Sequence, residues 1–260
     1  MQNLFIIIKI ACVLLFLQCG TVIAQSDEAI KLTRAEEAAS YPTTFGTRYF
    51  VTPSAIPREK GKFSLHSTEL RALSASLGLT KNVSLSAGFN VGVLFLDFED
   101  ALPFLTTKVG FEIAPKLYVG GGFFALHLND NEGPDLLGFG MVTLGDRNTN
   151  ITWTYMYDFT EGGITSGDDF RVVSPLSLSG MFRINKFISV VSENHLPSRS
   201  NRNLYHFAGF EGIRLIFKRN AIDLGAIVLR DSYRNYSFDG SLNKVAYYEW
   251  YPFFGYTFAF

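Results

Sequence analysis

Cysteine and charge are both scarce in this chain. The two cysteines, Cys12 and Cys19, lie within the first 24 residues, so a chain that loses this segment has no thiol, disulfide or cysteine metal ligand. Charged residues make up 18% of the sequence, against about 25% in a typical soluble domain. The formal net charge of -1 provides no field that would attract nucleic acid. Aromatic residues reach 15%, which indicates that something other than water solvates part of the surface.

The first 24 residues have the pattern of a secretory signal peptide. Lys9 is followed by an apolar core from Ile10 to Leu17 and by the small-residue cleavage site Val22-Ile23-Ala24. A retained anchor helix is the less favoured alternative, because the apolar run is far shorter than the roughly 20 residues that span a bilayer. We therefore expect export, removal of residues 1–24 and a mature chain that begins at Gln25.

Long apolar runs are absent after the signal, and a two-residue period takes their place. No stretch reaches 18 consecutive apolar residues, so no transmembrane helix is predicted. Residues 82–95, 105–113 and 151–158 each alternate large apolar side chains with polar ones. This period is typical of strands with one apolar and one polar face. The polar rows are rich in Gly, Ser and Thr, which suits a crowded lumen better than an open solvent face.

Strand length and turn spacing distinguish a membrane barrel from a soluble sandwich. Residues 82–95, 203–217 and 245–260 reach the 9–11 residues that a tilted membrane strand needs, whereas sandwich strands average about five or six. Short turns alternate with longer polar connections along the chain, as in outer-membrane barrels. We predict an all-β fold, a transmembrane antiparallel up-and-down β-barrel of twelve strands with both termini on the periplasmic side; ten strands is the alternative. The expected strands are roughly 61–68, 70–80, 82–95, 104–114, 116–128, 135–145, 149–158, 172–184, 186–195, 203–217, 220–231 and 245–260.

The last fourteen residues, "YYEWYPFFGYTFAF", carry an aromatic row. Unpaired strand edges are costly in lipid, so we expect the last strand to pair with the first and close the sheet. The segment resembles the C-terminal signal of outer-membrane barrels, which implies recognition by the barrel-insertion machinery. The aromatic side chains expected at the membrane interfaces are Tyr248, Trp250, Phe254, Tyr256, Phe258 and Phe260.

Four further stretches resemble a group of uncharacterised outer-membrane β-barrel proteins of Bacteroidota-type bacteria. They are "TRYFVTPSAIPREKGK", "LGLTKNVSLSAGFNVG", "KFISVVSENHLP" and "GFEGIRLIFKRNAIDLGAIV". The resemblance implies the fold, an outer-membrane location and contact with outer-membrane lipids, but no activity. The expected organisation is a signal peptide over 1–24, a flexible periplasmic N-terminal lead over 25–60 and the barrel over 61–260. A small plug inside the barrel is the alternative for residues 25–60.

Charged residues on the inward rows are the candidate lumen site. Lys108 and Glu112 share one strand face, Arg214 and Asp223 are expected to form a diagonal pair, and Glu249 is the only charge in the last strand. They predict an interior ion-pair network that fills a narrow barrel, or alternatively the lining of a small passage. Glu211 is three residues from Arg214, so the two side chains would point to opposite faces of a regular strand, and Glu211 requires a bulge or a rim position. The glycine run at 119–124 suits close packing in the lumen.

Catalysis is the weakest alternative. His195 lies near Ser198 and Ser200, and the stretch superficially resembles the motif of outer-membrane lipid hydrolases, but Pro197 stands where that motif has serine. The serines are expected at a loop tip, which rarely fixes a nucleophile. We therefore expect no enzymatic activity, metal or cofactor, and a passive channel for small solutes or a structural envelope component. An adhesion barrel that binds an envelope partner through loops 159–170 and 232–243, and an outer-leaflet lipid hydrolase that uses His195, are the alternatives.

Overall fold

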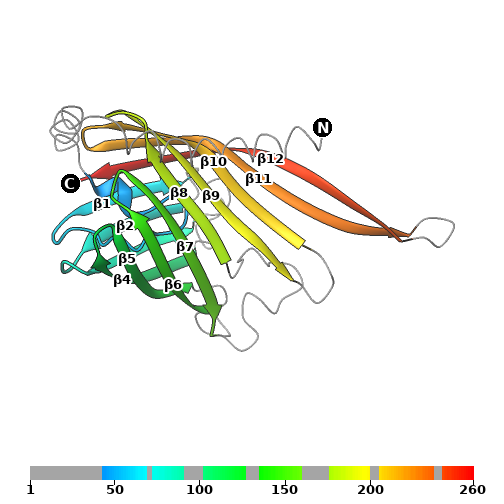
Figure 1. Ribbon diagram of the computed structural model, residues 1–260, viewed down its shortest axis with the longest axis horizontal. Coiled ribbons are helices and arrows are strands. Elements are labelled where there is room, and N and C mark those ends of the chain that lie inside the picture. The colour runs from blue at the N-terminus through cyan, green and yellow to red at the C-terminus, as the bar shows by residue number, and fades with distance from the viewer. Residues whose placement is uncertain are drawn as a thin grey trace. The chain divides into compact units, whose positions relative to one another are not determined.

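The computed structural model describes residues 43–68, 72–90, 102–126, 135–159, 176–199, 205–236 and 242–260. Twelve antiparallel strands pair in chain order and close into a barrel (Figure 1). They are β1 (Phe63–Thr68), β2 (Ala72–Gly78), β3 (Val83–Asn90), β4 (Leu102–Ala114), β5 (Leu117–Leu126), β6 (Asp135–Gly145), β7 (Thr149–Asp158), β8 (Leu176–Arg183), β9 (Ile188–Arg199), β10 (Tyr205–Phe217), β11 (Asn220–Tyr236) and β12 (Leu242–Ala259). The predicted twelve-stranded, up-and-down β-barrel is confirmed.

The last strand closes the sheet against the first, as predicted. Leu65 lies opposite Phe258, and Thr68 lies opposite Gly255. The Phe260 amide donates to the Phe63 carbonyl at 2.9 Å, so the pairing continues to the last residue. Closure satisfies the backbone groups that an open sheet would leave unpaired on its two edges.

The period-two pattern divides the barrel wall into two unlike faces. Inward positions are dominated by buried hydroxyl and charged groups, including Ser64, Ser84, Thr152, Ser177, Ser179, Ser189 and Thr257. Outward positions carry large apolar side chains that remain exposed, including Leu65, Leu73, Phe89, Leu105, Phe111, Phe123, Val142, Ile151, Trp153, Tyr155, Trp250 and Phe254. A water-soluble barrel would have the opposite arrangement, because burial of apolar surface drives its folding. None of the helices in the described ranges is both long and apolar enough to cross a membrane.

Two strand limits differ from the prediction. β9 continues to Arg199, so Ser198 is paired with His206 in the sheet and does not lie at a loop tip. β11 and β12 pair as far as Tyr236 and Leu242, so most of the expected loop 232–243 is a hairpin that extends beyond the other strands (Figure 1). The expected loop 159–170 lies outside the described residues except for Phe159.

The segment before the barrel is packed with it. Residues 42–260 form one compact unit, so the expected division at residues 60 and 61 is not where the contacts of the chain change. The segment starts with a 3-10 helix at Thr43–Thr47, and a bridge between Arg48 and Pro53 then folds it back on itself. Residues 43–58 are called the plug below, because their contacts place them in the lumen.

Candidate functional site: a plugged lumen

The plug is held from several sides of the barrel. Its backbone and side chains contact inward residues of β4, β6, β7, β8, β9 and β10. A segment that contacts so many strands of a closed barrel lies within it, and Figure 1 shows the blue segment inside the sheet. The lead expected over residues 25–60 therefore does not extend to residues 43–58; the plug alternative describes them. Residues 25–42 lie outside the described part.

Arg214 on β10 is the most extensively bonded plug anchor. It pairs with Asp223 on β11 through two hydrogen bonds, from Nε at 2.6 Å and from Nη2 at 3.0 Å, and both residues are buried. The two residues lie directly opposite each other, so the expected diagonal pairing is wrong, although the pair itself exists. The remaining guanidinium N–H groups donate to plug carbonyls, at 2.7 Å to Phe45 and 2.8 Å to Tyr49. One side chain therefore joins the barrel wall to the plug backbone.

Lys108 on β4 is a second anchor. Its Nζ donates to the carbonyls of Ser54 and Ile56, both at 2.9 Å, and of Thr47 at 3.3 Å. An ammonium group has three N–H donors, so this side chain is fully satisfied by the plug backbone. Lys108 is inward, as predicted, but it binds the plug and does not line an open passage.

Glu193 on β9 holds the tip of the plug. Its carboxylate accepts the amide of Val51 at 2.9 Å and that of Thr52 at 3.1 Å. His195, two residues along the same strand face, approaches the same carboxylate with Nε2 at 2.9 Å. His195 is thus part of the plug support on the inner face, away from the outer face where a membrane lipid would approach.

Hydroxyl groups extend the plug contacts to β6 and β7. The Tyr49 phenol contacts Asn150 Oδ1 at 2.6 Å and Thr152 Oγ1 at 2.5 Å. Thr152 is linked in turn to Thr143, which accepts the Ala55 amide at 2.8 Å. Small hydroxyl side chains fit here because a plug already fills the space between opposite walls.

Glycines of β4 and β5 allow the plug to approach the wall. A Cβ at Gly110 would lie 2.1 Å from the Ala55 carbonyl oxygen, and a Cβ at Gly120 would lie 3.4 Å from Ala55 Cβ. Gly110 and Gly120 face each other across the two strands. This agrees with close lumen packing at the glycine run, with the plug as the packed partner.

An apolar cluster also joins the plug to the barrel wall. Tyr49 and Phe50 of the plug pack with Met181, Val191 and Phe253 of the barrel in one buried cluster. The rings of Phe50 and Phe253 lie 4.9 Å apart. This cluster and the polar anchors together hold the plug against the inner face of the described wall.

Comparison with protein families and with curated proteins identified no relative of this chain. No family model and no curated protein matches the chain. The interpretation of the plugged lumen therefore depends on its geometry.

Two predicted lumen residues lie outside the network. Glu112 is exposed at the turn end of β4, where it accepts the Lys116 amide at 3.2 Å. Glu249 on β12 is exposed and accepts the Tyr251 hydroxyl at 2.7 Å. Of the five predicted charges, Lys108, Arg214 and Asp223 meet at the plug, and these two do not.

Glu211 faces outward and accepts hydrogen bonds from Ser192 at 3.0 Å and Asn194 at 3.3 Å. The pairing of β10 with β11 is regular on both sides of Glu211. An outward side chain therefore explains its position without the bulge or the rim position predicted from the sequence.

Glu193 is the anchor that the sequence prediction missed. It lies on the buried row of β9 with Ser189 and Val191, but apolar and polar residues do not alternate along this stretch, so its face could not be read from the sequence. The plug residues Tyr49 and Phe50 carried no signal, because their partners are distant in sequence and the segment has no period.

The C-terminal aromatic residues lie on the outward face. Tyr248, Trp250, Phe254, Tyr256 and Phe260 are exposed, and Phe258 packs edge-on against Phe260 with ring centroids 4.6 Å apart. Tyr256 donates to Asn220 Oδ1 at 2.5 Å, which fixes its polar end near the turn between β10 and β11. An apolar ring with a polar tip is the type of side chain that suits a membrane–water interface.

Proposed function

We propose that this protein is an outer-membrane β-barrel without enzymatic activity. The observation that supports this most directly is the inverted wall, with large apolar side chains outside and a hydroxyl-rich, charged interior. Hydrocarbon stabilises such an outer face, and a closed barrel satisfies the backbone hydrogen bonds that lipid cannot. The signal-like N-terminus and the terminal aromatic row agree with this location.

We further propose that the barrel is a narrow passage for small solutes that its own plug keeps shut at rest. Polar inward rows support a passage, and the buried anchors Lys108, Glu193 and Arg214 explain why it is closed. A structural envelope component is the second candidate, because the same anchors also fit a permanently filled barrel. His195 faces inward, so nothing in its placement favours a lipid hydrolase at the outer surface. An adhesion role would depend on loops that lie largely outside the described residues.

The location is tested by comparing boiled and unboiled protein purified from outer membranes. A lipid-embedded barrel keeps its fold in detergent and migrates differently until it is heated. A chain without its leader that stays folded and monomeric in plain buffer would contradict the proposal.

The passage is tested with a disulfide that locks the plug. Thr52 Oγ1 and Ser179 Oγ lie 3.1 Å apart, so the double variant Thr52→Cys/Ser179→Cys places two thiols within reach of each other. Because the native cysteines lie in the first 24 residues, the mature chain offers no competing thiol. In planar bilayers we expect discrete conductance steps from the reduced variant and none from the oxidised one.

The single variant Thr52→Cys is the matched control and should conduct under both conditions. If inserted, heat-modifiable protein stays silent in both redox states, the passage is refuted and the structural component remains.

A further inference from the structure

Positive charge gathers at one end of the barrel. This turn end is formed by the residues that lead into β1 and by the five short turns, at 59–62, 79–82, 115–116, 146–148, 184–187 and 218–219. The cations there are Lys60, Lys62, Lys81, Lys116, Arg147, Lys186, Lys218 and Arg219, and the acids are Glu59 and Asp146. At the adjoining strand ends Arg183 and Glu112 balance each other. Because the whole chain has a formal net charge of -1, this positive excess is a local feature.

The positive charge continues from the turn end into the barrel. Arg147 lies in the turn between β6 and β7, and its Nη2 donates to the Pro57 carbonyl at 3.0 Å. Its Nη1 lies 3.4 Å from a carboxylate oxygen of Glu59. Arg58, between these two residues in the chain, is buried, and Lys108 donates to the carbonyl two residues before it at 2.9 Å. In these contacts three cations share one carboxylate.

Arg58 is the least satisfied of the three cations. The residue is only 5% exposed. Its Nη2 donates to Thr47 Oγ1 at 3.4 Å, which is longer than an ordinary hydrogen bond. Its Nη1 is buried without a hydrogen-bond partner, and no carboxylate of the described residues pairs with it. Lys108 approaches the carbonyl of the same Thr47 at 3.3 Å, so a second positive charge lies nearby.

The buried acids are engaged elsewhere. Within the described ranges these are Glu193 and Asp223, against the buried cations Arg58, Lys108 and Arg214. Asp223 pairs with Arg214, and Glu193 accepts two plug amides and approaches a histidine. A buried cation without a counter-charge is costly, so the surroundings of Arg58 favour an anion.

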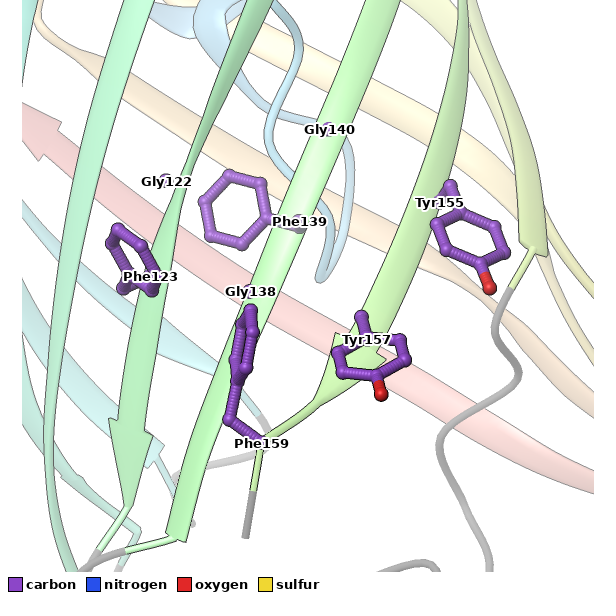
Figure 2. A pocket seen from close by; sticks show the side chains of 8 residues that line it. All are labelled: Gly122, Phe123, Gly138, Phe139, Gly140, Tyr155, Tyr157 and Phe159. Carbon is purple, nitrogen blue, oxygen red and sulfur yellow. The ribbon is translucent and has the colours of Figure 1, made fainter.

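A lipid headgroup does not account for this charge. Arg58 and Lys108 are buried inside the barrel, where a headgroup of the surrounding leaflet does not reach. On the outer wall in Figure 2, Phe123 and Tyr157 flank Gly138, and every residue that lines this hollow is glycine, phenylalanine or tyrosine. The cations therefore lead inward from the turn end and not along this part of the lipid-facing surface.

We propose that the passage takes small oxyanions of the size of inorganic phosphate, and that Arg58 binds them near the turn end. The inference rests on the proposed passage. Exposed cations at the turn end raise the local concentration of anions. A guanidinium group then offers two parallel donors to two oxygens of one oxyanion. Because Nη1 of Arg58 is closed to water at rest, the oxyanion reaches it by taking the place of Glu59 beside Arg147.

The test uses the full mature chain in planar bilayers of phosphatidylcholine, a lipid without net charge. In a gradient of potassium chloride, the open steps should pass chloride in preference to potassium. Inorganic phosphate should compete with chloride and reduce its current. Arg58→Gln should weaken this phosphate effect roughly 10- to 100-fold, because a charge-assisted hydrogen bond is lost.

Three further variants separate the binding site from a general effect of charge. Arg199→Gln, which removes the same charge at the loop end of β9, is the matched control and should leave the phosphate effect unchanged. Arg58→Lys keeps the charge without the fork, so it should keep the chloride preference and lose part of the phosphate affinity. Glu59→Gln removes the competing carboxylate and should strengthen the phosphate effect.

The turn end is tested separately through its dependence on salt. The triple variant Lys81→Gln/Lys116→Gln/Lys218→Gln removes three exposed cations from three turns. It should lower the chloride preference at about 0.01 M salt, where charges act over about 30 Å, and have little effect at about 1 M, where they act over about 3 Å.

Failures of the inference and of the proposed passage are distinguishable. Steps that prefer potassium, or a phosphate effect that is equal in Arg58→Gln, would overturn the oxyanion site and leave the passage. Steps that respond to phosphatidylglycerol in the bilayer and not to phosphate would assign the turn end to lipid headgroups and would also overturn the site.

Inserted, heat-modifiable protein that stays silent would refute the passage itself. Equilibrium dialysis of the same protein against radiolabelled phosphate still tests the site. Uptake by wild type that is lost in Arg58→Gln would support it, and equal uptake by both would overturn it.

Discussion

Replacing Lys108 by methionine removes the ammonium that holds three plug carbonyls and keeps much of the side-chain length. Hydrogen bonds to charged groups contribute about 1.5–3 kcal/mol each, so the gross loss is about 4.5–9 kcal/mol. Burying an ammonium costs several kcal/mol, and the variant avoids that cost. We therefore expect Lys108→Met to weaken plug docking by about 2–4 kcal/mol.

Hydrogen exchange on reconstituted protein measures this change. At 1.4 kcal/mol per factor of ten, the buried plug amides of Thr52 and Ala55 should exchange roughly 30- to 700-fold faster, while amides of the barrel strands change little. Glu112→Gln is the matched control on the same strand, and it should leave plug exchange unchanged because Glu112 is at the rim. Wild-type exchange at the plug amides in Lys108→Met would refute the assignment of Lys108 as an anchor.

Three further changes test other contacts. Arg214→Leu leaves Asp223 buried without its partner and should cost about 3–5 kcal/mol in unfolding experiments in vesicles, whereas Arg214→Leu/Asp223→Leu should cost less; equal losses would contradict the ion-pair interpretation. Gly110→Val places a Cβ on the Ala55 carbonyl, so protease sensitivity of the plug should rise with the barrel intact. Deletion of Phe260 removes the bond that ends the closing strand pair, and it should reduce the yield of heat-modifiable barrel in outer membranes.

The wall of the barrel was predictable because the alternation within a strand shows which of its side chains face the lumen and which face outward. Alternation in β3, β4 and β7 depends only on neighbouring residues, and the structure keeps this parity along the three strands as far as the irregularity between Glu112 and Ala114. The aromatic row at the C-terminus followed from the same rule. Strand ends were less predictable, since pairing in β9 and β11 continues through polar residues that resemble a loop.

The pairing of Arg214 follows from the turn between β10 and β11. Lys218 adopts a positive φ of 46°, and the two-residue turn is Lys218-Arg219, as the expected strand limits at residues 217 and 220 imply. Phe217 then pairs with Asn220, and counting back along both strands places Arg214 opposite Asp223. The diagonal expectation for Arg214 and Asp223 was therefore an error of register and not of the strand limits.

The plug was predictable only as an alternative. Residues 43–58 have no period, and their order comes from contacts with wall residues far along the chain, such as Glu193 and Arg214. The inward charges were the usable signal. Buried charged side chains require partners, and Asp223 and the Met181 sulfur satisfy only part of the Arg214 guanidinium, so its other N–H groups bond to carbonyls of the plug.

The enclosure of the plug also constrains the order of assembly. A segment surrounded by a continuous hydrogen-bonded wall cannot enter through that wall once β1 and β12 have paired. Either residues 43–58 are wrapped before those two strands pair, or they thread in afterwards through one end. In the first route the plug, which is synthesised before the strands, serves as a template around which the sheet forms. Pairing of the last strand with the first then encloses the plug.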